Sequence, residues 1–457
     1  MSGLEPLGGT GRRWAVVGGG ILGLAVARHL RADGHDVTLY EGADDLGGLA
    51  SAWTIDLPGG ERLIWDRYYH VTLLSDLRTR GLLDDLGLTD EVRWVETRTG
   101  CYADGELYSV SNAVEFLRFP PLGLLDKLRL GGTILYGARI RDGRRMERVG
   151  VSDWLRRWSG RRTYERFWLP LLRAKLGESY REASAAFIWS TIQRLYAARR
   201  TGLKKEMFGY VHGGYARTID AFAARLRAGG VDLRTGCPVS SVRREGDGFV
   251  IATPSGDERA DRVVVTTAAP LASRLCPELD DDERGRLDGA RYQGIVCESL
   301  VLRRPLAPYY LTNITDPGTP FTAVVEMTSL IDPAEVAGHT LVYLPKYVAP
   351  DDPLLDASDE DVHEAFWPYL RQMHPTLTDE DLVARRVSRA RLVFAVPTLG
   401  YSDGVPPIVT SVPGLYLVGS ADLVHATLNV DDTLGLADEA VALIAGAEGS
   451  RAEAVTA

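Results

Sequence analysis

The distribution of hydrophobic and polar positions near the N-terminus predicts a strand, a helix and a second strand within residues 13–40. Arg13–Val17 is a short continuous apolar run, which is typical of a buried parallel strand. Residues 24–32 carry apolar side chains at helical spacing, and Asp36–Tyr40 is a second short apolar run. This order predicts a βαβ unit and therefore an α/β fold with a parallel sheet.

Three glycines between the first strand and the helix follow the spacing G-x-G-x-x-G. Gly18 permits a tight turn, Gly20 leaves room for a pyrophosphate, and Gly23 lets the helix pack closely on the sheet. The helix N-terminus, with Ile21 and Leu22, offers unpaired N–H groups and a partial positive charge to phosphates. A complete strand, turn and helix of this kind predicts a dinucleotide site.

An acidic residue, Glu41, ends the second strand and lies 23 residues after Gly18. An acid in this place can accept hydrogen bonds from the ribose hydroxyls of an adenosine. It also disfavours a 2′-phosphate, which argues against NADP as the ligand.

A second glycine pair follows in Gly47-Gly48-Leu49-Ala50. With this pair the chain resembles the flavin-containing amine oxidase superfamily, which includes protoporphyrinogen oxidase-like and phytoene desaturase-like FAD-dependent oxidoreductases. The resemblance implies FAD as the cofactor, with the backbone of these four residues passing along it. Relatives often have arginine after the glycine pair, whereas this chain has Leu49.

The resemblance extends to segments far from the N-terminus. It implies that the backbone of Val239 contacts the adenine. A buried strand within 412–419 ends in Gly419, and Ser420 replaces the aspartate that contacts the ribityl chain in relatives.

A final helix, expected over Leu434–Ile444, has its N-terminus at the N1/O2 edge of the flavin in relatives. The residues that the resemblance places at that edge are Val430, Asp431, Asp432 and Thr433. Acids are unusual there, so Asp431 and Asp432 either lie at the flavin or cap the helix.

These patterns predict an α/β chain with an α+β substrate lobe. A Rossmann-like FAD-binding domain would consist of three segments, 1–75, 206–275 and 386–457. Between them we expect a basic helical substrate lobe over 76–205 and a β-rich substrate-binding domain over 276–385. Helices are expected over 116–143 and 151–196, and strands over 294–302, 321–326 and 341–344.

Charge is unevenly distributed along the chain. The net charge is −10, but residues 118–205 contain 21 Lys and Arg against 7 Asp and Glu. These basic residues either decorate exposed helix faces or meet an anionic substrate or a membrane surface. The apolar segment Phe119–Leu125 is expected in the core first, with peripheral membrane contact as the alternative. An acidic chain without a recognised nucleic-acid module predicts no nucleic-acid partner.

Cysteine and histidine usage argues against other site types. Four scattered cysteines and eight unclustered histidines predict no metal and the reduced thiols of a cytoplasmic protein. No cysteine sits in a recognisable attachment motif, so we expect non-covalent FAD. No apolar run is long enough to cross a bilayer, and no second G-x-G-x-x-G suggests a separate NAD(P)H domain.

Few side chains stand out as catalytic candidates. His70 is either a general base or a structural histidine, and Tyr310 and Lys346 lie in stretches suited to a pocket wall. Many amine oxidases have a lysine near flavin N5 on the strand that aligns with 294–302, where this chain has Cys297.

The predicted function is an FAD-dependent oxidoreductase that removes a hydride from a C–N or C–C bond of a small metabolite. Anionic compounds and isoprenoid intermediates are both candidate substrates, and hydride would pass to flavin N5 and then to O2 or another acceptor. The alternative is a redox-neutral flavoenzyme resembling nucleotide-sugar mutases, which would act on a phosphorylated sugar. A third hypothesis is a non-catalytic FAD-binding protein.

Overall fold

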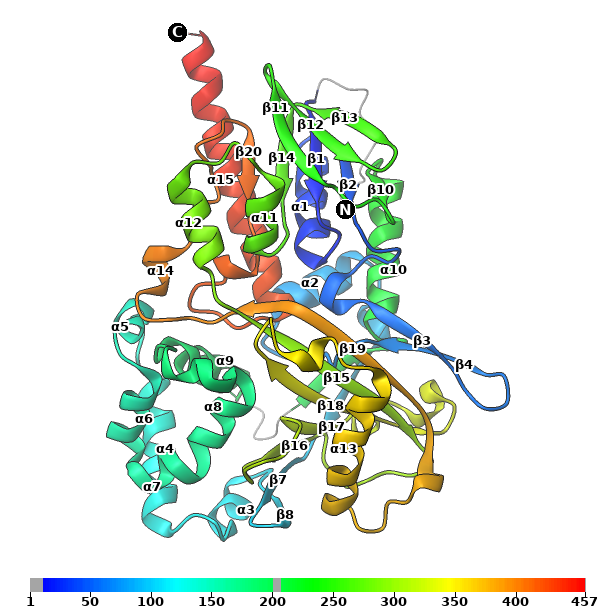
Figure 1. Ribbon diagram of the computed structural model, residues 1–457, viewed down its shortest axis with the longest axis vertical. Helices are drawn as coiled ribbons and strands as arrows, with labels where there is room; N and C mark the ends of the chain where they lie inside the picture. The colour runs from blue at the N-terminus through cyan, green and yellow to red at the C-terminus, as the bar shows by residue number, and fades with distance from the viewer. Residues whose placement is uncertain (1–10, 200–206, 457) are drawn as a thin grey trace.

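A parallel sheet forms the centre of the upper half of the molecule in Figure 1, a computed structural model that describes residues 11–199 and 207–456. Its strands β1 (Arg13–Val17) and β2 (Asp36–Tyr40) have the bounds that the sequence predicts. The sheet is wholly parallel because helical or long connections join its strands. Its strand order is β10 (Asp232–Arg234), β2 (Asp36–Tyr40), β1 (Arg13–Val17), β14 (Arg262–Val265) and β20 (Leu415–Leu417).

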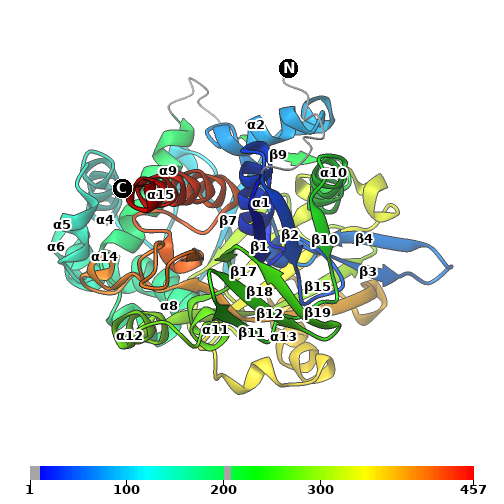
Figure 2. The same ribbon diagram turned by 90° about the horizontal axis from the view of Figure 1, so that it is seen from above.

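Each face of this sheet has its own cover. Helices α1 (Ile21–Ala32), α10 (Gly214–Ala228) and α15 (Val430–Thr456) share one apolar cluster on one face, and Figure 2 shows them side by side. The other face packs on an antiparallel sheet and two helices. These elements are β11 (Ser241–Glu245), β12 (Gly248–Thr253), β13 (Gly256–Ala260), α11 (Ala269–Leu275) and α12 (Asp281–Gly289). The predicted α/β class is confirmed.

A second, mostly antiparallel sheet lies below the first in Figure 1. Helix α13 (Asp359–Met373) packs on one face, and the aromatic side chains of the opposite face form a separate cluster. The strand order is β19 (Leu382–Ala395), β15 (Tyr292–Leu302), β18 (Thr340–Val348), β17 (Ala323–Glu326), β16 (Leu311–Ile314), β7 (Thr99–Ala103) and β8 (Glu106–Ser109). The β-rich character predicted for this region is present.

A group of helices lies beside this sheet, at the lower left of Figure 1. The helical character expected over 116–143 is present, but two prolines and a glycine within 120–123 divide the segment into separate helices. The helix expected over 151–196 is likewise divided. The observed elements are α3 (Ala113–Arg118), α4 (Leu124–Gly137), α5 (Gly143–Glu147), α6 (Val151–Ser159), α7 (Arg161–Thr163), α8 (Leu169–Leu176) and α9 (Ala186–Arg199).

The expectation that 119–125 is core holds for only part of the segment. Phe119 and Leu122 are buried, but Leu124 and Leu125 of α4 are 66% and 60% exposed. Leu128, one turn further along, is 62% exposed. The structure therefore leaves an apolar face of α4 uncovered.

Smaller elements connect these parts. They are the hairpin β3 (Ala52–Asp56) and β4 (Arg62–Asp66), the sheet β5 (Thr72–Leu73), β9 (Met207–Val211) and β6 (Val92–Glu96), and helices α2 (Leu77–Asp85) and α14 (Tyr401–Gly404). Within residues 11–199 and 207–456, no helix has the length and apolar character that a membrane crossing requires. Over the same ranges, no three His, Cys, Asp or Glu side chains are grouped as a metal site would need.

Candidate flavin and substrate site

The turn between β1 and α1 has the geometry of a phosphate cradle. Gly18 has a φ of 116°, and a Cβ at Gly23 would overlap the carbonyl oxygen of Gly18. A Cβ at Gly20 would have no heavy atom nearer than 4.0 Å, so the space in front of this residue is open. No side chain caps α1 and its first turn contains no acid. The first N–H groups of α1 are therefore available to an anion.

Glu41 lies against this turn. One carboxylate oxygen accepts a hydrogen bond from the backbone N–H of Gly19 at 2.7 Å. The other oxygen accepts one from Ala43 N–H at 2.8 Å. The carboxylate is thus held at the end of β2, where its remaining lone pairs can accept ribose hydroxyls.

The glycine pair packs directly on the turn. Gly47 donates its N–H to the carbonyl of Gly19 at 2.8 Å, and a Cβ at Gly48 would lie 3.2 Å from Gly20 Cα. Both glycines have positive φ, 109° and 58°. Ala50 is buried, and the half-buried Leu49 contacts the aromatic cluster of the second sheet. The loop therefore links the phosphate turn to the second sheet.

The segment with Val239 also reaches this end of the sheet. Cys237 donates its backbone N–H to the carbonyl of Glu41 at 2.8 Å. Val239 follows two residues later and is half-buried. The structure thus brings this segment beside the acid that ends β2.

Gly419 and Ser420 follow β20, as the resemblance implies. A Cβ at Gly419 would lie 2.6 Å from the carbonyl oxygen of Thr267, so only glycine fits without movement. Ser420 Oγ donates to the hydroxyl of Tyr292 at 3.3 Å.

Asp422, which the sequence analysis did not select, is the acid of this segment. Its carboxylate accepts the N–H of Gly419 at 2.8 Å, and burial raises its pKa to about 7. The sequence could have indicated Asp422, because this acid lies two residues after Ser420, which replaces the aspartate of relatives.

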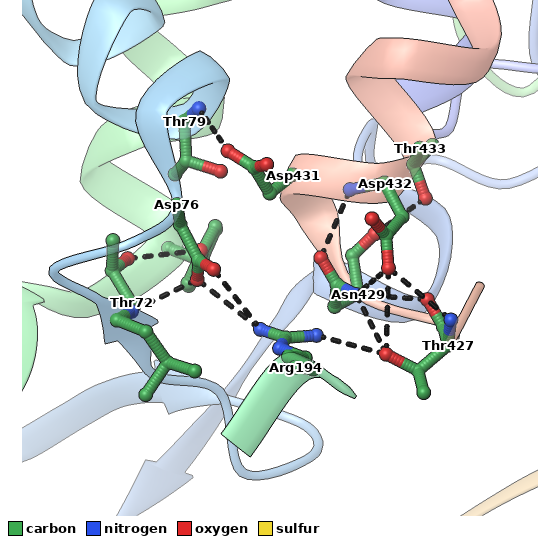
Figure 3. A network of polar contacts seen from close by, with 11 residues as sticks. Thr72, Asp76, Thr79, Arg194, Thr427, Asn429, Asp431, Asp432 and Thr433 are labelled. Carbon is green, nitrogen blue, oxygen red and sulfur yellow. Dashed lines mark hydrogen bonds and ion pairs between the residues drawn. The ribbon is translucent and has the colours of Figure 1, made fainter. Parts of the chain in front are cut away.

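The start of α15 carries a polar network, shown in Figure 3. Asn429 caps the helix, because its side-chain oxygen accepts the N–H of Asp432 at 2.9 Å. Asp431 instead accepts the N–H of Thr79 in α2 at 2.9 Å. Asp432 accepts the N–H of Thr427 at 3.2 Å. The alternative that these two acids cap α15 is therefore wrong. Asp431 holds the helix N-terminus to α2, and Asp432 holds it to the loop directly before the helix.

The other two residues expected here complete the helix start. Thr433 Oγ1 donates to the carbonyl of Asn429 at 2.7 Å, and Val430 packs against the cluster of α1 and α15.

Arg194 of α9 connects the helical region to this network. Its guanidinium forms an ion pair with Asp76 at 3.1 Å and donates to Thr427 Oγ1 at 3.2 Å. Burial raises the pKa of Asp76, and Arg194 offsets part of that shift. Sequence reasoning missed this pair because its members are 118 residues apart.

The expected catalytic candidates are not brought together. His70 is paired through Nδ1 with the carbonyl of Tyr68 at 2.9 Å, and burial lowers its pKa to about 4. This environment favours the structural alternative. Lys346 is half-buried on β18 and pairs with Val296, whose side chain belongs to the cluster under α13. It therefore lies on the face of the sheet opposite Tyr310.

Comparison with known proteins identifies the family. A family model described as flavin-containing amine oxidoreductase matches residues 22–433. The chain belongs to this family. A flavin is therefore the cofactor type that the family implies.

Two curated relatives of this chain are named as carotenoid enzymes. A carotenoid phi-ring synthase of Streptomyces griseus is 28% identical over 64% of this chain and 60% of the relative. A probable zeta-carotene desaturase of Synechococcus elongatus is 26% identical over 58% and 60%. The match thus spans about three fifths of the length of these relatives.

Solved structures share the fold across nearly the whole chain. A protein assigned as a protoporphyrinogen oxidase from Exiguobacterium sp. 255-15 has a TM-score of 0.74 at 19% identity, covering 96% of this chain and 99% of its own. Reduced UDP-galactopyranose mutase has a TM-score of 0.72 at 16% identity, covering 95% and 96%. At these identities the likeness shows the fold alone.

The residues at the turn fit the adenosine diphosphate half of a flavin dinucleotide. The uncapped start of α1 and the open space at Gly20 suit a pyrophosphate. The fixed carboxylate of Glu41 suits a ribose. The residues present therefore support the cofactor that the family implies.

Proposed function

We propose that this protein is an FAD-dependent oxidoreductase that removes a hydride from a C–N or C–C bond of a small metabolite. The observation that carries the proposal is the phosphate cradle of α1, with Glu41 and the glycine pair packed against it in a member of a flavin family. FAD would supply the hydride acceptor and pass the electrons to O2 or another acceptor. We also propose that the protein is cytoplasmic.

The chain's own residues would bind and orient this cofactor. The first N–H groups of α1 would hold the pyrophosphate, and Glu41 would accept the ribose hydroxyls. Residues 47–50, Val239 and Gly419–Ser420 would line the remaining length. The three segments 1–75, 206–275 and 386–457 would together form the FAD-binding domain.

The binding is proposed to be non-covalent. Cys101, Cys276 and Cys297 are buried thiols, and burial raises the pKa of each. Thiols of this kind are poor nucleophiles.

The proposed substrate has an extended apolar body. Aromatic side chains line the face of the second sheet that Leu49 contacts. The relatives include two enzymes named for carotenoids, and a carotenoid is an extended, conjugated apolar molecule. Such a body needs little acid–base assistance at the carbon that loses hydride.

The first test is the visible spectrum of the purified protein before and after denaturation. Two oxidised-flavin bands that stay in the supernatant would support non-covalent FAD. Anaerobic bleaching by an isoprenoid or an amine would then support hydride removal. Turnover of a nucleotide sugar only after reduction, with no oxidant consumed, would replace this function with the redox-neutral alternative. A colourless protein that stays colourless with added FAD would contradict both.

The apolar face of α4 is proposed to contact an anionic membrane surface. Leu124, Leu128 and Leu135 recur at spacings that place them on one helix face, and each is exposed. Arg129 of α4 is exposed as well, and so is Arg139, which follows the C-terminal end of this helix. Apolar side chains flanked by arginine suit an interface with anionic lipid headgroups.

Vesicle sedimentation tests this partner. The native protein should sediment with vesicles that contain anionic phosphatidylglycerol and less with neutral phosphatidylcholine. The double variant Leu124→Ser and Leu128→Ser should lose most of this binding. Leu443→Ser is the control, since Leu443 is 53% exposed on α15, away from this face. Equal sedimentation of both variants would contradict the assignment.

A further inference from the structure

A lysine from the helical region lies between two tyrosines of the substrate region. Lys175, near the end of α8, donates from Nζ to the hydroxyl of Tyr347 at 2.7 Å. The same Nζ lies 3.5 Å from the hydroxyl of Tyr69 and 4.0 Å from the centre of the Tyr347 ring. The two hydroxyls are 3.2 Å apart. Hydrogen bonds and a cation–π contact thus fix the ammonium in one place.

Three separate parts of the chain meet at this cluster. Tyr347 belongs to β18, Tyr69 follows the hairpin strand β4, and Lys175 comes from α8. Tyr69 and Tyr347 pack in the same apolar cluster as Leu49 of the glycine-pair loop and Cys297 of β15. The ammonium therefore lies over the same sheet face as Cys297, and a helix supplies it.

Within the described ranges, the partners of the Lys175 ammonium are two neutral tyrosines. Among the residues that the structure describes, no Asp or Glu forms an ion pair with it. Burial raises the pKa of Tyr347 to about 12 and also raises that of Tyr69, so both hydroxyls stay neutral. A half-buried cation without a counter-ion is costly, because it has lost part of its hydration. An anionic ligand would remove this cost.

Tyr310 provides an independent sign of a missing ligand. It is 4% exposed, and its hydroxyl has no hydrogen-bond partner in the described part of the chain. Tyr310 belongs to the same apolar cluster as Tyr69 and Tyr347, and Tyr69 adds to the rise in the pKa of Tyr310 that burial causes. Buried hydroxyls nearly always have a partner, so an unpaired one in the apolar cluster that Tyr69 and Tyr347 share points to a polar group that binds here.

We propose that Lys175, with the hydroxyls of Tyr347 and Tyr310, binds a carboxylate of the substrate. This inference rests on the proposed function and narrows its substrate to an apolar molecule that carries a carboxylate. A single ammonium matches the single charge of a carboxylate, whereas a phosphate dianion would need more positive charge. Lys175 would then determine specificity and position the apolar body along the aromatic face.

Binding of benzoate and of its neutral isostere benzamide to the FAD-loaded protein tests the proposal. Calorimetry measures both affinities, and perturbation of the flavin absorbance shows whether the probe lies near the ring. The native protein should bind benzoate and should bind benzamide at least about tenfold more weakly, because a charged hydrogen bond is lost. Lys175→Met should weaken benzoate binding about tenfold or more and leave benzamide unchanged.

Two further variants distinguish a loss of carboxylate binding from a loss of folding. Tyr347→Phe keeps the ring but removes the hydroxyl, so benzoate binding should weaken by several fold. Lys346→Met is the matched control on the opposite face of β18, and its benzoate affinity should equal that of the native protein. Equal benzoate affinity in Lys175→Met and native protein, or no binding by the native protein, would overturn the inference. A protein without flavin would instead contradict the proposed function, while calorimetry still reports carboxylate binding.

Discussion

The carboxylate of Glu41 lies 2.7 Å from the backbone nitrogen of Gly19, inside the phosphate turn. A single acid at the end of β2 thus holds both the turn and its own loop through Gly19 and Ala43. The proposed acceptor for a ribose is therefore oriented before any cofactor binds, which would lower the entropy cost of binding.

Glu41→Gln should weaken FAD binding by about tenfold to a hundredfold, because charge-assisted hydrogen bonds to the ribose become neutral ones. Quenching of flavin fluorescence on titration with apoprotein measures this. Glu61→Gln, on the exposed turn of the β3–β4 hairpin, should leave the affinity unchanged. Unchanged affinity in Glu41→Gln would argue that the ribose lies elsewhere.

Two glycine-to-alanine substitutions should have opposite effects. A Cβ at Gly23 would overlap the carbonyl oxygen of Gly18, so Gly23→Ala should displace α1 from the turn. We expect loss of FAD binding and a loss of stability of roughly 2 kcal/mol. Gly285→Ala in α12 meets no heavy atom within 4 Å and should raise stability by about 0.5–1 kcal/mol. Thermal unfolding of both variants separates a local clash from a general effect of alanine.

The sequence was sufficient for the parts of the site that neighbouring residues build. The bounds of β1 and β2, the glycine spacing and Glu41 all follow from local patterns, since a turn and its helix are short-range structures. The parallel pairing of β1 with β2 follows from the βαβ pattern, and β20 lies within the strand expected over 412–419. The place of β14 between β1 and β20 does not follow from a local pattern.

Contacts between distant segments were not predictable in the same way. Lys175 meets Tyr347 across 172 residues, and no local pattern distinguishes it from other basic residues of the helical lobe. Asp431 was expected at the flavin or as a cap, yet it bonds to Thr79 of α2, 352 residues away. Tertiary packing determines such partners, and one sequence without an aligned family does not reveal them.

Arg194→Met should destabilise the protein by about 2 kcal/mol at neutral pH, because Asp76 would lose its cation while remaining buried. Burial already raises the pKa of Asp76, and loss of Arg194 would raise it further. The folded variant would then take up a proton at a higher pH than the unfolded chain does. Its deficit relative to the native protein should therefore shrink as pH falls and Asp76 becomes neutral.

Denaturant unfolding of native protein, Arg194→Met, Asp76→Asn and the double variant measures this coupling. The double variant should be more stable than Arg194→Met alone, because no buried charge is then left unpaired. A deficit in Arg194→Met that is independent of pH and of Asp76 would show that Arg194 acts through packing only.

Asp422 should make the stability of the protein fall as pH rises from about 4 to about 7. Its pKa is about 7 in the folded protein against an ordinary 3.8, because burial disfavours the charged carboxylate. Between these values the folded state keeps a proton that the unfolded chain has lost, so each pH step in this window favours unfolding. Above the window the full penalty applies, on the order of a few kcal/mol.

Asp422→Asn removes this ionisation but keeps an oxygen that can accept the N–H of Gly419. The variant should therefore unfold at a higher temperature than the native protein at pH 8, and the difference should become small near pH 4. Circular dichroism melts at pH 4, 6 and 8 measure it. Asp288→Asn, at the exposed end of α12, should show no such trend. A lower melting temperature for Asp422→Asn at pH 8 would mean that the ionised carboxylate itself stabilises the segment after β20.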